Sequence, residues 1–275
     1  MCELFAMSSR QPSAVTYSLR EFAANGSGLR SNRSGWGIAY AHDRDAFTIK
    51  EPLSAAGSPW VDFVAENSVK SKCVIAHVRH ATRGSHTLEN THPFRRVLGR
   101  QVQLFAHNGT LEGIERACDA DALVYTPVGE TDSELAFCLL LDRLRPLWRE
   151  NGGAAPPLAV RMEMFVAFCR EMGRLGSANF LYFDGDALFA HAHRRVHEVA
   201  GQVTPPEPPG LRLKDWSRDQ VDRDYTAPGL TVDVHDRQTV MLASVPLDED
   251  GWESLPEGTA LAIRDGTELE RCTTL

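Results

Sequence analysis

Apolar residues recur at the three- and four-residue spacing of a helix in four parts of the chain. This spacing predicts helices over residues 14–24, 58–67, 131–148 and 158–172. Ser13 and Ser58 are the predicted N-caps of the first two, and Pro59 fits a first helical position. The third helix is expected to open at a capping box that runs from Thr131 to Glu134.

Other apolar runs are short and rich in β-branched and aromatic residues. Residues 73–79 and 101–107 are apolar on both faces, which is typical of strands covered on both sides, and residues 238–247 form a further strand. Segments 179–193 and 259–270 are each divided by Asp-Gly, a hairpin signal. Strands that pair through hairpins predict antiparallel sheets with helices packed on their faces.

A proline-rich stretch at 201–210 predicts a surface loop, because proline lacks the N–H that a central strand needs. We expect one domain rather than two, since neither side of this loop carries enough apolar segments to close a core by itself. A chain of 275 residues is compatible with either arrangement.

Composition and charge exclude several classes of protein. The chain is 43% hydrophobic and 24% charged, as in ordinary globular proteins. Its formal net charge of -8 argues against a nucleic-acid-binding protein. No signal peptide or membrane span is predicted, and six scattered cysteines without CxxC pairs do not form a disulfide framework. We therefore expect a cytoplasmic protein with no nucleic-acid or membrane partner.

Polar clusters lie where predicted elements begin or end, a common place for functional sites. They are SGWG at 34–37, HVRHATRG at 77–84, HNGT at 107–110 and ETDSE at 130–134. Each has an ordinary structural explanation. Asn-Gly is the commonest hairpin dipeptide, an aspartate at a helix start favours the helix dipole, and a lone histidine is usually a core or surface residue.

Cys2 has unusual chemistry if Met1 is removed. It would then carry a thiol, with an ordinary pKa of about 8.5, beside its own α-amine, with an ordinary pKa of about 7.7–8.0. An N-terminal amine can act as the base that activates a nucleophile on the same residue. Cys2 is therefore a candidate catalytic nucleophile.

The polar clusters supply the other parts of an amide-hydrolysing site. A tetrahedral oxyanion needs fixed donors, and the Asn108 carboxamide and the Gly109 backbone N–H could supply two. An amino-acid substrate also carries two charges. Arg79 matches its α-carboxylate, and Asp132 matches its α-ammonium.

Six motifs in this order resemble those of the class II glutamine amidotransferases, which are N-terminal-nucleophile hydrolases. They are MCELF, SGWG, HVRHATRG, ENTHPF, AHNGT and GETDSE, and the match runs from residue 2 to about 145. Residues 243–263 are similar to the free-standing, YafJ-like members of the family. Two positions depart from the synthase-linked members, which often have Trp at the position of His80 and His at that of Arg83.

The resemblance implies an α+β fold, a four-layer αββα sandwich of antiparallel sheets with helices on both outer faces. It implies a single domain over residues 2–275, with Met1 removed, and neither a metal nor a cofactor. Cys2 would be the nucleophile, with Asn108 and Gly109 as the oxyanion hole. The residues expected to contact substrate are Arg79, Thr82, Asp132, His80 and Trp36.

The implied reaction is attack of the Cys2 thiolate on the γ-carboxamide of L-glutamine, with release of ammonia and then of glutamate from a γ-glutamyl thioester. A partner synthase would accept the ammonia. The alternative is hydrolysis of a γ-glutamyl conjugate with a larger leaving amine. Two other classes compete with this interpretation: a non-catalytic regulatory protein, which the presence of Cys2, Asn108 and Asp132 disfavours, and a metallohydrolase. No HExxH motif supports the latter, despite the histidines at 77, 80, 86, 92, 191 and 193.

Overall fold

The computed structural model describes most of the chain. The described residues are 2–17, 34–55, 58–67, 69–79, 84–117, 122–199, 202–216, 225–227, 230–233, 238–247 and 251–275.

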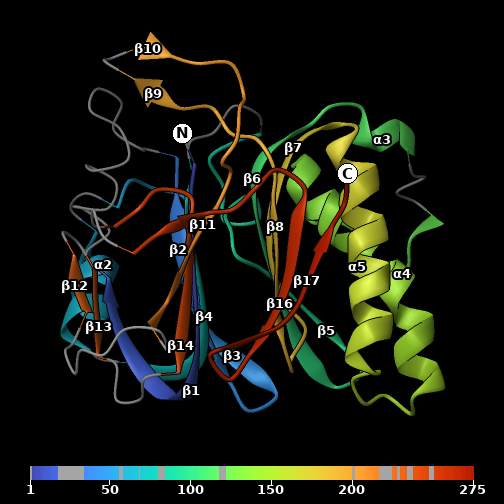
Figure 1. The fold of residues 1–275 in the computed structure, drawn as a ribbon, viewed down its shortest axis with the longest axis horizontal. Helices are drawn as coiled ribbons and strands as arrows, with labels where there is room; N and C mark the ends of the chain where they lie inside the picture. Colours follow the sequence, from blue (N-terminus) through green and yellow to red (C-terminus); the bar gives the residue numbers. More distant parts are fainter. Residues whose placement is uncertain are drawn as a thin grey trace.

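Two antiparallel sheets form the centre of the molecule (Figure 1). The nine-stranded sheet contains β1 (Glu3–Tyr17), β2 (Trp36–His42), β3 (Asp45–Glu51), β4 (Lys70–Val78), β11 (Arg212–Asp215), β12 (Tyr225–Ala227), β13 (Leu230–Asp233), β14 (Thr239–Ala243) and β15 (Glu253–Ser254). The six-stranded sheet contains β5 (Phe94–Leu98), β6 (Gln101–Leu111), β7 (Gly176–Phe183), β8 (Leu188–Ala192), β16 (Thr259–Arg264) and β17 (Thr267–Thr273). A separate two-stranded hairpin joins β9 (Glu198–Val199) to β10 (Gln202–Val203).

Helices cover the outer face of each sheet. Figure 1 shows α2 (Pro59–Glu66) outside the nine-stranded sheet, and α4 (Asp132–Glu150) and α5 (Leu158–Gly173) outside the six-stranded sheet. A short α3 (Ile114–Ala117) precedes α4. One hydrophobic cluster lies under α2, one under α4 and α5, and one between the sheets. The expected α+β sandwich is therefore confirmed.

The alternation of side chains along β1 decides which residues reach the space between the sheets. Leu4 and Ala6 belong to the cluster between the sheets, whereas Phe5 and Met7 belong to the cluster under α2. Successive side chains of a strand point to opposite faces. Continuing this alternation to Cys2 places its side chain on the face of β1 that is turned toward the six-stranded sheet.

The predicted helix over 14–24 is wrong in its described part. Residues up to Tyr17 belong to β1, where Ala14 pairs with Lys70 on one side and with Asp233 on the other. Two flanking strands offer this segment backbone partners, and tertiary pairing overrides a weak helical preference. Ser13, the predicted cap, is a buried residue of the same strand. Residues 18–24 lie outside the described residues.

The other three predicted helices are confirmed. The Ser58 hydroxyl accepts from the N–H of Trp60, 3.2 Å away, at the start of α2. The Thr131 hydroxyl likewise accepts from the N–H of Glu134 at 3.2 Å, where α4 begins. None of the helices in the described part of the chain combines the length and apolar character needed to cross a membrane.

Candidate active site

Cys2 and Arg79 lie at neighbouring ends of two central strands. Glu3 of β1 is paired with Val78 of β4, so the next antiparallel step brings Cys2 opposite Arg79. Burial lowers the pKa of Arg79, and the negative charge of a Cys2 thiolate opposes that shift. The guanidinium is therefore close enough to stabilise the thiolate form of Cys2 electrostatically.

The residue after Cys2 is held by a buried ion pair. The carboxylate of Glu3 lies 3.1 Å from Nη2 of Arg195, and its second oxygen accepts from the Ser244 hydroxyl at 2.7 Å. That hydroxyl also accepts from the N–H of Leu4 at 2.8 Å. Breaking such a buried pair leaves an uncompensated charge. The start of β1 is thus fixed by residues from the second half of the chain.

Asn108 and Gly109 lie inside β6, not in a hairpin turn. The side-chain amide of Asn108 donates to the carbonyl oxygen of Cys2 at 2.7 Å, which joins the two sheets at Cys2. A Cβ on Gly109 would lie 1.8 Å from the carbonyl oxygen of Ser177 on β7. Only glycine fits this close approach of two backbones.

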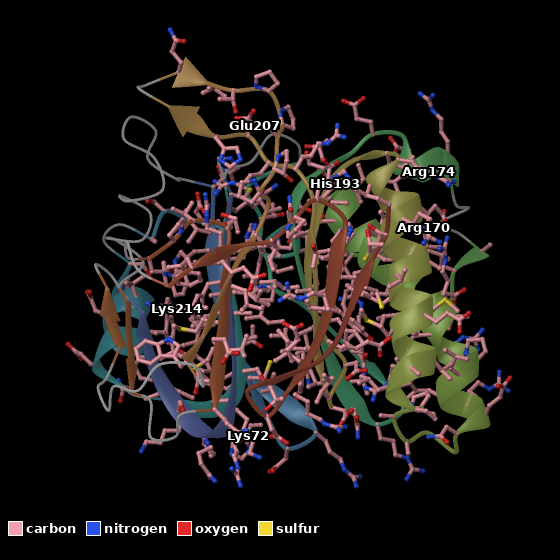
Figure 2. The ribbon with its side chains drawn as sticks, in the orientation of Figure 1. Lys72, Arg170, Arg174, His193, Glu207 and Lys214 are labelled. Atoms are coloured by element: carbon pink, nitrogen blue, oxygen red, sulfur yellow. The ribbon has the colours of Figure 1, made fainter. Side chains whose placement is uncertain are left out.

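Asn179 is a polar core residue that the sequence analysis did not single out. Its side-chain NH₂ donates to the carbonyl oxygens of Asn108 at 2.9 Å and Arg194 at 2.7 Å. Its oxygen accepts from the N–H of His193, which Figure 2 shows at the upper end of the second sheet. Asn179 is 0% exposed, and its partners are backbone groups distant in the sequence, so no local signal in the sequence marked it.

Asn90 connects the loop after Arg79 to the segment before α4. One Arg79 nitrogen donates to the Ser85 carbonyl oxygen at 3.0 Å, and the Asn90 amide donates to the same oxygen at 3.2 Å. The Asn90 oxygen accepts from the N–H of Glu130 at 2.8 Å, and Asn90 is 0% exposed. This residue, which belongs to the ENTHPF motif but was given no role there, therefore couples the surroundings of Arg79 to those of Asp132.

Asp132 is the first residue of α4 and is tied to the end of β6. One of its oxygens accepts from the N–H of Leu111 at 2.7 Å, and the other accepts from its neighbour Ser133 at 2.9 Å. A helix N-terminus favours a carboxylate at this position. A cavity of about 230 Å³ opens beside Asp132, lined by Glu130, Thr131 and Leu135 among others.

A larger cavity, of about 520 Å³, lies at the other end of the sandwich and includes Lys72, which Figure 2 labels at the lower edge. Charged side chains on its wall are joined in pairs. Lys72 lies 3.0 Å from Asp265, and Arg264 lies 3.3 Å from Asp186. This pairing favours neither an anionic nor a cationic ligand there.

The structure thus brings five of the eight expected site residues to one end of the sandwich. They are Cys2, Arg79, Asn108, Gly109 and Asp132, linked through the register and the hydrogen bonds given above. Thr82 and His80 lie outside the described residues.

Trp36 is placed differently from the expectation. It is 0% exposed and belongs to the cluster under α2, and its indole N–H donates to a Glu51 carboxylate oxygen at 3.1 Å. Trp36, Ile38 and Tyr40 share one face of β2, and this face is turned away from the six-stranded sheet. Because Cys2 lies on the opposite face, we assign Trp36 a structural role instead of a substrate contact.

Two histidines are buried between the sheets near Arg79. The rings of His77 and His92 lie 4.2 Å apart, centroid to centroid. Burial lowers the pKa of His77 to about 3, with the charges of His107 and Arg79 acting in the same direction. Burial also lowers the pKa of His92 well below its ordinary value. Within the described ranges, no group of three or more His, Cys, Asp or Glu side chains could hold a metal ion.

Replacing Asn90 with alanine is expected to raise the KM for substrate and to lower the free energy of unfolding by about 1–3 kcal/mol. The reason is that two part-buried hydrogen bonds are lost, one from the N–H of Glu130 and one to the Ser85 carbonyl oxygen. Steady-state kinetics and urea unfolding measure both effects. Thr91→Ala is the matched control, because Thr91 donates within the same loop, to the Thr87 carbonyl oxygen at 2.8 Å. Equal KM values in the two variants would contradict a coupling role for Asn90.

The profile of the family described as glutamine amidotransferases class-II matches residues 1–274. The Escherichia coli protein YafJ, named as a glutamine amidotransferase, is 34% identical over 199 residues, covering 72% of this chain and 76% of YafJ. An uncharacterized protein of Methanocaldococcus jannaschii is 31% identical over 270 residues, covering 97% of this chain and 70% of that protein.

Solved structures agree with these sequence relationships. A predicted glutamine amidotransferase from Pseudomonas aeruginosa superposes with a TM-score of 0.64 at 30% identity, covering 98% of this chain and all of that one (100%). Glutamine phosphoribosylpyrophosphate amidotransferase from Bacillus subtilis is 15% identical with a TM-score of 0.60, and this chain covers 49% of it. That last likeness concerns the fold alone. The chain belongs to the class II glutamine amidotransferases, a family of enzymes.

Proposed function

We propose that this enzyme hydrolyses the γ-amide of L-glutamine with Cys2 as the nucleophile. The observation that carries the proposal is the 2.7 Å hydrogen bond from the Asn108 carboxamide to the backbone of Cys2. This bond holds an amide donor beside the proposed nucleophile, across two sheets, and attack on a carbonyl needs such preorganised donors for its oxyanion.

The reaction follows from the groups present. After loss of Met1, the α-amine of Cys2 takes the thiol proton, and the thiolate attacks the γ-carbonyl carbon. The tetrahedral oxyanion accepts hydrogen bonds from Asn108 Nδ2 and the Gly109 N–H. The C–N bond then breaks, the leaving nitrogen takes the proton from the α-amine, and ammonia departs. Water, deprotonated by the same amine, hydrolyses the γ-glutamyl thioester to glutamate and regenerates the thiol.

Substrate orientation is assigned to two charged residues, one that follows a strand and one that begins a helix. Arg79 follows β4 and would bind the α-carboxylate, while Asp132 begins α4 and would bind the α-ammonium. Asn90 links the backbone around one to the backbone before the other, which supports a shared role. Thr82 and His80 remain proposed contacts on the Arg79 side of the substrate.

We further propose that residues 2–275 act as one domain in a reducing, cytoplasmic setting. The pairing of β1 with both β4 and β14 interleaves the two halves of the chain. The five cysteines within the described residues are free thiols. A reactive N-terminal thiol is best preserved where thiols stay reduced.

The fate of the nitrogen is the open part of the reaction. Transfer to an acceptor would require a synthase partner that receives ammonia before it escapes to water, whereas hydrolysis alone would require none. We rank glutamine first, because the family and the relative YafJ are named for it.

Purified enzyme with a free Cys2 N-terminus is expected to release ammonia and glutamate in equal amounts from L-glutamine. The test measures kcat/KM for L-glutamine against a panel of γ-glutamyl amides with larger leaving amines, with the protein alone and with co-purifying partners. Negligible glutamine turnover beside rapid cleavage of one conjugate would reverse our ranking. If the enzyme cleaved none of the γ-glutamyl amides, the proposed function itself would be wrong.

A further inference from the structure

A chain of hydrogen bonds runs from β7 to the start of α4 through His107, which the proposed reaction does not use. His107 is 2% exposed and lies on β6 directly before Asn108. Its Nε2 is 2.9 Å from the Ser177 carbonyl oxygen, and its Nδ1 is 2.9 Å from the Ser133 hydroxyl. That hydroxyl is in turn 3.3 Å from Oδ1 of Asp132.

The chemistry of these groups fixes where the protons lie. A carbonyl oxygen has no hydrogen, so Nε2 of His107 must donate to Ser177. In neutral His107 the other nitrogen, Nδ1, is then an acceptor, and the Ser133 hydroxyl donates to it. The hydroxyl has a single hydrogen, so it does not donate to Asp132 at the same time.

His107 is held in this neutral state by its surroundings. Burial lowers the pKa of His107, against the opposing effects of the Asp132 charge and the Ser177 carbonyl. Two further titratable groups, His77 and His92, interact with it electrostatically, and burial lowers their own pKa values. Neutral His107 therefore keeps the Ser133 hydroxyl turned away from Asp132.

The consequence concerns the capacity of Asp132 to accept hydrogen bonds. Among the described residues, the N–H groups of Leu111 and Ser133 donate to its two oxygens. A carboxylate has about four acceptor positions, so two remain for an ammonium group. A hydroxyl turned onto Oδ1 would occupy one of these and lower the negative charge offered to substrate.

We propose that His107 and Ser133 are positioning residues that keep the Asp132 carboxylate available for the α-ammonium of the substrate. This inference rests on the proposed function. His107 acts through Ser133, because it accepts the hydroxyl hydrogen that Ser133 would otherwise donate to Asp132. Neither residue touches the reacting atoms.

The experiment compares variants of His107 that differ in where they offer an acceptor. His107→Leu removes the acceptor, so the KM for L-glutamine is expected to rise about tenfold to a hundredfold with kcat little changed. His107→Asn places its side-chain oxygen near the position of Nδ1 and is expected to keep a KM close to that of the wild type. Adding Ser133→Ala to His107→Leu removes the misdirected hydroxyl and is expected to restore the KM.

Glutaramate, which has the side-chain amide of glutamine but no α-amine, provides the matched substrate control. Its kcat/KM is expected to be the same in the wild type and in each variant, because no ammonium meets Asp132. The inference would be overturned if the KM for L-glutamine rose further in the double variant than in His107→Leu. It would also be overturned if the variants lost as much kcat/KM with glutaramate as with L-glutamine, because either result would show a merely structural role.

A second comparison decides the matter if His107→Leu does not fold. The amide of His107→Gln lies near the position of Nε2 and can donate to Ser177, but it offers Ser133 no acceptor. The KM of His107→Gln should therefore be higher than that of His107→Asn. Equal KM values for the Gln and Asn variants would overturn the inference. If the wild type turns over glutamine and every His107 variant has the wild-type KM, this inference alone is wrong and the proposed function is unaffected.

Discussion

Replacing Cys2 with alanine is expected to abolish amide hydrolysis and to leave the fold intact. The expected loss in kcat is on the order of 10⁴-fold or more, because removing a covalent nucleophile leaves only the binding and oxyanion contributions. The side chain is half-buried at the end of β1, and its backbone carbonyl, which accepts from Asn108, is retained in alanine. The effect on stability should therefore be small.

Ammonia release, thermal unfolding and intact mass together test this result. Cys272→Ala is the control, because Cys272 is also half-buried but lies on β17. It should keep wild-type activity. The mass of the active wild-type enzyme should correspond to a chain that begins at Cys2. Full activity in protein that retains Met1 would disprove the N-terminal amine as the base.

Replacing Asp132 with asparagine should raise the KM for L-glutamine by roughly thirtyfold to several thousandfold. Loss of one partner of a buried, charged hydrogen bond costs about 2–5 kcal/mol, and each 1.4 kcal/mol or so is a factor of ten. Asparagine keeps the size of the side chain, and its oxygen can still accept from the N–H of Leu111. The charge that would bind an α-ammonium is what the substitution removes.

A second aspartate of the same helix supplies the control for Asp132→Asn. Asp142 accepts from the N–H of Val124 at 3.2 Å, and Asp142→Asn should leave the KM near the wild-type value. Alkylation of the Cys2 thiol by iodoacetamide should proceed at a similar rate in both variants, which separates substrate binding from thiol reactivity. An unchanged KM in Asp132→Asn would mean that the ammonium binds elsewhere.

Local signals in the sequence were sufficient for most elements of the fold. The capping hydroxyls of Ser58 and Thr131 and the hairpins at Asp184-Gly185 and Asp265-Gly266 depend on neighbouring residues only, and each is confirmed. The segment that was predicted wrongly, 14–17, depends on strands supplied by residues 70–71 and 230–233. Its neighbours are distant in sequence, so spacing along the chain cannot reveal them.

The candidate site shows the same division between local and distant information. Residues with their own chemistry, such as Cys2 and Asp132, could be picked out by type and position. Asn90 and Asn179 could not, because an asparagine acquires its role from the carbonyl and N–H groups that the fold places around it. Trp36 shows a further limit of the motifs, because membership of a motif does not reveal which face of the sheet a side chain occupies.

The anchoring of Glu3 by Arg195 and Ser244 has a consequence for how the enzyme is made. β1 cannot acquire its β14 neighbour, or Glu3 its buried partners, until residue 244 has been synthesised. At about 5–20 residues per second, ribosomes need roughly 12–50 seconds to reach that point. Throughout this interval the emerging N-terminus lacks its final contacts and remains open to the aminopeptidase that would remove Met1. A fragment that ends near residue 145, where the six-motif match ends, lacks Arg195 and Ser244 and should consequently not form the buried contacts that fix the start of β1.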